Sequence, residues 1–169
     1  MTNHLQQLKH LQELAQKIGF QASILEKSEN SPLDVLSISV ANDDDEEGYR
    51  LDLVFFPRNV DLEGAELLQF FYLYPHTFNE TGLQNVVQIL PLINNRMSLG
   101  HLSINHIENT VQFKYILPLP FDKEVDILFF KDVLEICMFS PTLFEKIIFD
   151  LATAQITVEE AKRQIIQAE

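Results

Sequence analysis

The clearest pattern of hydrophobic and polar positions lies between Leu99 and Leu117. Apolar side chains recur there at every second residue along two runs, which the polar segment 105–109 separates. A period of two is typical of strands that bury one face. The asparagines at both ends of the polar segment tolerate the left-handed backbone of a short turn. The pattern predicts a β-hairpin whose buried face holds Gly100, Leu102, Ile104, Val111, Phe113, Tyr115 and Leu117.

The segment 22–26 is a candidate for a short strand, and three longer segments have clear strand character, namely 33–41, 49–56 and 66–74. The last of them is apolar on both faces, which is typical of a strand that is covered on both sides, by helices or by a partner. The acidic run 43–48 lacks the residue spacing of an EF-hand calcium loop and predicts a solvated hairpin tip.

Two further segments repeat their apolar positions every three or four residues, which predicts amphipathic helices at 3–18 and 79–95, and the apolar segment 125–139 predicts a third helix. Pro91 removes a backbone donor, so it should kink the second helix or end its regular part early. The third helix is apolar around most of its circumference. Because one sheet covers only one face of a helix, this segment has more apolar surface than a single sheet can bury.

Local signals also mark the C-terminal helices. Ser140 and Pro141 should cap a new helix that continues to Leu151, since proline suits the first helical position. A capping box, Thr157-Val158-Glu159-Glu160, should open the last helix, with a supporting pair between Glu159 and Arg163. The segment 117–120 contains two prolines and predicts an extended connector.

These elements predict an α+β fold, with an antiparallel β-sheet of about five strands flanked by N-terminal, middle and C-terminal helices. A length of 169 residues suits one domain with a single core. We therefore expect a single domain over 1–169, with a helical C-terminal extension at 140–169.

Charge and composition make some classes of binding partner and some cellular locations unlikely. Twenty-five acidic and twelve basic residues give a formal net charge of -13, which disfavours binding to nucleic acid or anionic lipid. No apolar run approaches the roughly 20 residues that span a bilayer. A single cysteine and the lack of a secretory pattern at the N-terminus indicate a cytoplasmic protein.

No motif for catalysis, phosphate binding or metal binding is present, and we expect no cofactor. Cys137 lies between Ile136 and Met138, which favours a buried apolar role. The polar cluster that could serve a pocket between sheet and helices is His101, His106 and Glu108. An enzyme or small-molecule-binding protein using these residues is the alternative function, although turn histidines are more often only polar surface residues.

One part of the chain resembles a known family. The helix end Leu90–Asn95, the strand Gly100–Ile104, the strand Val111–Tyr115 leading into Leu117-Pro118-Leu119, and the apolar helix after Asp126 carry this resemblance. They resemble the YbjN-type family of bacterial proteins, within the type III secretion chaperone-like fold. The resemblance implies a non-enzymatic homodimer that binds other proteins as a chaperone or regulator.

The surplus of apolar surface leads to the same expectation. We expect a homodimer or partner interface that uses Leu67, Phe71, Leu73, Ile127, Phe130, Leu134 and Met138. A purely structural subunit is a third possibility.

Overall fold

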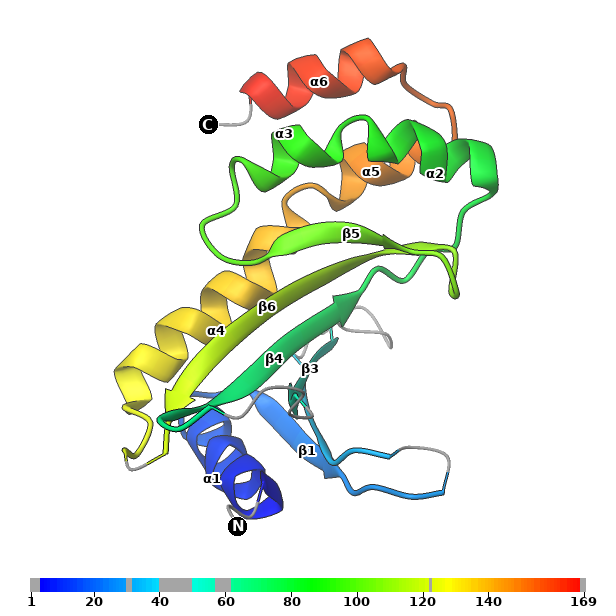
Figure 1. Ribbon diagram of the computed structural model, residues 1–169. Helices are drawn as coiled ribbons and strands as arrows, with labels where there is room; N and C mark the ends of the chain where they lie inside the picture. Colours follow the sequence, from blue (N-terminus) through cyan, green and yellow to red (C-terminus); the bar gives the residue numbers. More distant parts are fainter. Residues whose placement is uncertain (1–3, 30–31, 40–49, 57–61, 122, 168–169) are drawn as a thin grey trace. The chain divides into compact units, whose positions relative to one another are not determined.

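The computed structural model describes residues 4–29, 32–39, 50–56, 62–121 and 123–167. The described helices and strands are labelled in Figure 1. In chain order they are α1 (His4–Lys17), β1 (Gln21–Leu25), β2 (Val35–Ser39), β3 (Arg50–Phe55), β4 (Ala65–Leu73), α2 (Glu80–Val87), α3 (Leu90–Asn94), β5 (His101–Asn105), β6 (Thr110–Pro120), α4 (Ile127–Thr142), α5 (Glu145–Ala152) and α6 (Val158–Gln167). The acidic run 43–48, expected to form a hairpin tip, lies outside the described residues.

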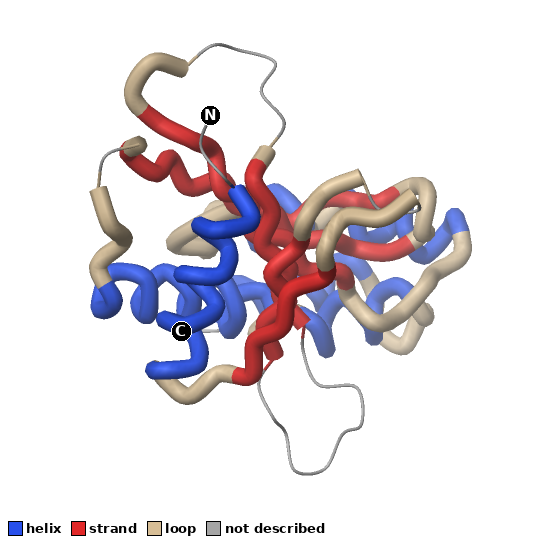
Figure 2. The backbone as a smooth tube through the Cα atoms, turned by 90° about the horizontal axis from the view of Figure 1, so that it is seen from below, coloured by secondary structure: helices blue, strands red, loops and turns tan. Residues whose placement is uncertain are grey.

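The strands, drawn in red in Figure 2, form an antiparallel sheet in the order β1-β2-β3-β4-β6-β5. The α+β fold class is therefore confirmed. The sheet has six strands where about five were expected, because the short first segment pairs with β2 along its whole length. The predicted hairpin is also confirmed, with Leu102 opposite Phe113 and Ile104 opposite Val111.

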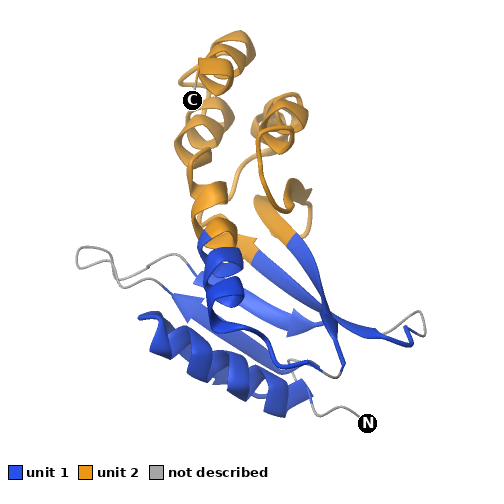
Figure 3. Ribbon diagram, turned by 90° about the vertical axis from the view of Figure 1, so that its left-hand side faces the viewer, with its two compact units in different colours: residues 1–71, 115–135 blue, residues 72–114, 136–169 orange. Residues whose placement is uncertain are grey.

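The chain forms two compact units, coloured separately in Figure 3. Unit 1 comprises residues 1–71 and 115–135, and unit 2 comprises residues 72–114 and 136–169. The expected extension 140–169 thus lies within unit 2. The division of the chain into domains stays a prediction, as β4, β6 and α4 each contribute residues to both units.

In unit 1, helix α1 packs on β1 and β2 (Figure 3). Its apolar stripe is buried, as the period of 3.6 residues predicts, and consists of Leu8, Leu11, Leu14 and Ala15. On its polar side, Gln12 and Gln16 both donate hydrogen bonds to the carbonyl oxygen of Ala22, at 3.0 and 3.1 Å. Since β1 is an edge strand, these bonds cover part of a backbone edge that would otherwise be open.

Strand β4 alternates between buried and half-buried residues. Glu66, Leu68, Phe70 and Tyr72 are buried, whereas Leu67, Gln69 and Phe71 are half-buried and Leu73 is exposed. One face of this strand is thus buried within the chain, and the expectation that a partner covers the other face stays a prediction. A run that is apolar on both sides does not by itself reveal whether a second layer covers it.

In unit 2, the predicted helix 79–95 is two helices, α2 and α3. The Asn79 side chain caps α2 by accepting a hydrogen bond from the Gly82 amide at 2.8 Å. Pro91 stands in the first turn of α3, where its missing N–H costs little. Helix α2 approaches α5 so closely that a Cβ atom on Gly82 would overlap the carbonyl oxygen of Ala152.

Two of the predicted boundaries in the second half of the chain differ from the structure. Helix α4 does not stop before Ser140-Pro141 but continues to Thr142, with Pro141 inside its last turn. The carbonyl oxygen of Pro141 accepts a hydrogen bond from the Tyr74 hydroxyl at 2.6 Å, a tertiary contact that no local signal reveals. The expected connector 117–120 is instead the end of β6, whose two prolines lie at exposed positions.

The capping box of α6 is confirmed. The Thr157 hydroxyl accepts from the Glu160 amide at 3.2 Å, and the Glu160 carboxylate accepts from the Thr157 amide at 2.8 Å. The expected side-chain pair between Glu159 and Arg163 is not formed. The Glu159 carboxylate pairs with Lys162 at 2.8 Å, while Arg163 donates to the Glu159 carbonyl oxygen.

Candidate functional site

Helix α4 carries large apolar side chains that the chain does not bury. The exposed fractions are 68% for Leu128, 47% for Phe129, 50% for Phe139 and 73% for Leu143, which directly follows the helix. Leu128 and Phe129 lie in the first turn of the helix, in unit 1, whereas Phe139 and Leu143 lie at its C-terminal end, in unit 2. We call these four residues the α4 face.

Three residues expected at an interface lie inside the chain. Phe130 and Leu134 are completely buried and Met138 is 4% exposed, so none of them is available to a partner. They recur every four residues and form the inward side of α4. The sequence predicts more apolar surface on this helix than one sheet can cover. The residues that it places at an interface, however, lie on the buried side of the helix.

The other predicted interface residues keep some exposure. Ile127, Leu67 and Phe71 are half-buried, and Leu73 is exposed. Whether any of them meets another protein stays a prediction. The residues of the α4 face were missed because an almost uniformly apolar helix contains no sequence signal for which side faces outward.

The polar cluster of the alternative function lies on the surface of unit 2. His101, His106 and Glu108 are all exposed, and the register places His101 opposite Lys114. The turn between the strands is held by Asn105, whose side-chain oxygen accepts hydrogen bonds from the next amides at 3.0 and 3.2 Å. No group of three or more His, Cys, Asp or Glu among the described residues could hold a metal ion.

Cys137 is fully buried, as its apolar neighbours predicted. Burial raises the pKa of its thiol to about 12, because an apolar surrounding disfavours the thiolate. A nucleophilic cysteine needs a lowered pKa and access to its substrate. Cys137 has neither.

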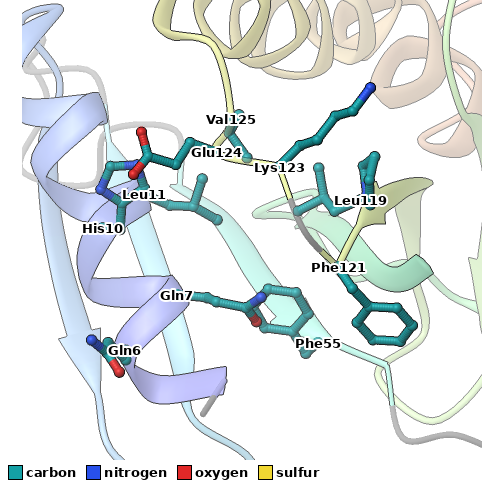
Figure 4. A pocket seen from close by; sticks show the side chains of 11 residues that line it. Gln6, Gln7, His10, Leu11, Phe55, Leu119, Phe121, Lys123, Glu124 and Val125 are labelled. Atoms are coloured by element: carbon teal, nitrogen blue, oxygen red, sulfur yellow. The ribbon is translucent and has the colours of Figure 1, made fainter. Parts of the chain in front are cut away.

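Unit 1 contains a pocket of about 500 Å³ between α1 and the segment that leads from β6 to α4 (Figure 4). Its apolar lining consists of Leu11, Phe55, Leu119, Pro120, Phe121 and Val125, and its polar lining of Gln6, Gln7, His10, Lys123 and Glu124. None of these residues was predicted as a site residue. They come from separate parts of the chain, so no motif joins them.

Phe55, which lines one side of the pocket, stacks on His4, and His4 is hydrogen-bonded to Glu66. The ring of His4 stacks on the ring of Phe55, with centroids 4.6 Å apart and planes inclined by 13°. His4 Nε2 lies 3.0 Å from Oε1 of Glu66, whose side chain is only 3% exposed. The pair holds the His4 ring in place, and stacking on that ring orients Phe55.

Among the residues described, none of the helices combines the length and hydrophobicity that crossing a membrane requires. Comparison with known proteins identified no family model, no curated protein and no solved structure that matches this chain.

Proposed function

We propose that this chain is a non-enzymatic, cytoplasmic protein-binding module that acts as a homodimer through the α4 face. The observation that carries this proposal is the exposure of Leu128 and Phe129 at the start of α4, and of Phe139 and Leu143 near and directly after its end. Exposed apolar side chains that gather in this way are typical of interaction surfaces, whereas single scattered ones are ordinary. The resemblance to YbjN-type proteins supports a chaperone-like or regulatory role for such a dimer.

The charges on the same helix support a second copy as the occupant. Between Leu128 and Phe139 the helix carries one basic residue, Lys131, which pairs with Glu135 at 3.6 Å, and one further acidic residue, Asp132. A contact between two copies of α4 would thus combine the exposed apolar side chains with this small charged group. Since each copy has a net charge of -13, repulsion between the whole molecules should oppose association at low salt. We therefore expect added salt to strengthen the dimer.

Sedimentation velocity of the full chain across the micromolar range tests the proposal. We expect a dimer for the unchanged protein and a monomer for the double variant Phe139→Ser, Leu143→Ser. Both side chains are at least half exposed, so the variant should unfold at the same temperature as the original protein. The matched control is Val87→Ser on α2, which removes an exposed apolar side chain outside the α4 face and should leave the dimer intact.

Two results would contradict the proposal. The first is a monomer of the unchanged protein at every concentration and salt level. The second is a dimer that the double variant retains, since association would then use another surface.

A further inference from the structure

The pocket of unit 1 and the start of helix α4 are neighbours along the chain. Val125 lines the pocket, and Leu128 and Phe129 follow it in the first turn of α4. Asp126 fixes this turn, because its side-chain oxygen accepts hydrogen bonds from the amides of Leu128 and Phe129 at 3.0 and 2.9 Å. Each copy of the chain therefore presents an apolar pocket and two exposed apolar side chains within a few residues of each other.

The pocket offers accessible apolar surface to another molecule. Phe121 and Val125 in its lining are half-buried, and Pro120 is exposed. Its volume of about 500 Å³ lies within the range of pockets that take up drug-sized ligands, and the side chains of Leu128 and Phe129 together are smaller than such a ligand. The exposed apolar side chains thus suit the pocket of another copy in chemistry and in size.

The charges at the pocket match those of a second copy. Lys123 and Glu124 both line the pocket, are exposed, and form no ion pair with any other described residue. Figure 4 shows the Lys123 ammonium group and the Glu124 carboxylate extending in different directions. In a two-fold contact, residue i meets residue j and residue j meets residue i. A second copy therefore supplies an opposite charge to each of them, which an apolar small molecule does not.

We propose that Leu128 and Phe129 of each copy enter the pocket of the other copy and pack against Phe121 and Val125, while Lys123 of one copy pairs with Glu124 of the other. This inference rests on the dimer of the proposed function and assigns the unit 1 part of its interface. The contact is closed, because each pocket is filled by the copy whose own pocket it fills. It therefore yields a dimer and not an open chain of copies.

Reversal of one charge in the full-length protein tests the pairing. Glu124→Lys turns two attractive pairs into two repulsive ones and should weaken the dimer about tenfold in sedimentation velocity. The same change makes the chain less acidic, so general repulsion alone would strengthen the dimer. Glu108→Lys on the exposed turn of unit 2 changes the net charge equally and should not weaken it. The double variant Lys123→Glu, Glu124→Lys should recover the original affinity.

A fluorescence experiment tests the insertion itself. The chain contains no tryptophan, so Phe129→Trp provides a single fluorophore at an exposed position. A nitroxide, which quenches tryptophan at short range, is attached to the variant His10→Cys at an exposed residue of the pocket. Mixing the two proteins should lower the tryptophan emission. A nitroxide on His106→Cys, in the turn of unit 2, is the control and should leave the emission unchanged. Cys137 is buried and does not take up the label.

Two results would overturn this inference and leave the dimer itself in place. One is a dimer that Glu124→Lys weakens no more than Glu108→Lys does. The other is tryptophan emission that the pocket label quenches no more than the control label. Thermal unfolding of each variant verifies that it folds. A monomer of the unchanged protein at every concentration would instead remove the proposed function, and this inference with it.

Discussion

Asn94 pairs with the backbone of Leu102 in the way that a neighbouring strand would. Its side-chain oxygen accepts a hydrogen bond from the Leu102 amide at 2.7 Å, and its side-chain nitrogen donates to the Leu102 carbonyl oxygen at 3.1 Å. Strand β5 is at the edge of the sheet, and Leu102 itself is buried. The carboxamide at the end of α3 therefore closes an edge that could otherwise pair with another chain.

Replacing Asn94 by alanine should destabilise the protein by about 1–3 kcal/mol, because two backbone groups of Leu102 lose their partners. Urea unfolding measures this change, and hydrogen exchange should show faster exchange at the Leu102 amide. Asn95→Ala is the control, since Asn95 is exposed and uses only its backbone to end α3. Equal stability of the two variants would show that the pairing contributes nothing.

The close approach of α2 and α5 makes Gly82 sensitive to any side chain. A Cβ at this position would overlap the backbone carbonyl of Ala152, which cannot rotate away. We expect Gly82→Ala to cost about 1–3 kcal/mol, as overpacking of a core typically does. Gly64→Ala offers a matched control, because a Cβ added there would meet nothing within 4 Å, and its stability should change by no more than about 0.5 kcal/mol. If Gly64→Ala unfolded at a lower temperature than Gly82→Ala, the close contact between α2 and α5 would not be the cause of the destabilisation.

The capping box of α6 should make part of the stability depend on pH. The hydrogen bonds from the backbone amide and hydroxyl of Thr157 lower the pKa of Glu160. A lowered pKa means that folding favours the carboxylate, so this contribution is present above the pKa in the unfolded chain, about 4.3, and is lost as the pH falls through the lower value in the folded protein.

Glu160→Ala should therefore unfold at a lower temperature than the original protein at neutral pH, and the difference should shrink in acid. Differential scanning calorimetry across this range provides the measurement. Gln164→Ala alters the same helix without removing a titrating group, so its effect should not vary with pH. A pH-independent effect of Glu160→Ala would exclude the carboxylate as the cause.

The buried thiol of Cys137 gives a simple test of the packing of α4. With a pKa of about 12, only about one thiol in ten thousand is ionised at pH 8. We expect no reaction with a thiol-specific disulfide reagent in the native protein, and complete reaction in urea. Rapid labelling without denaturant would show that the inward side of α4 is open to solvent.

Features that depend on neighbouring residues were predicted well. The alternation from Val111 to Leu117 identified a strand, although Gln112 on its polar side is buried as well, and the spacing of Thr157 and Glu160 identified a helix start. These signals work because strand and helix periods, and the hydrogen bonds that cap a helix, involve residues only a few positions apart.

The sites depend on contacts between distant parts of the chain. The sequence by itself determined that α4 has too much apolar surface, but only the tertiary structure decided that Phe130 faces inward and Phe139 outward. It also decided that Pro141 stays within α4 and that Gln7 and Phe55 line one pocket. The physical reason is that burial is set by whichever elements pack against a side chain, and a nearly uniform apolar pattern is compatible with more than one such packing.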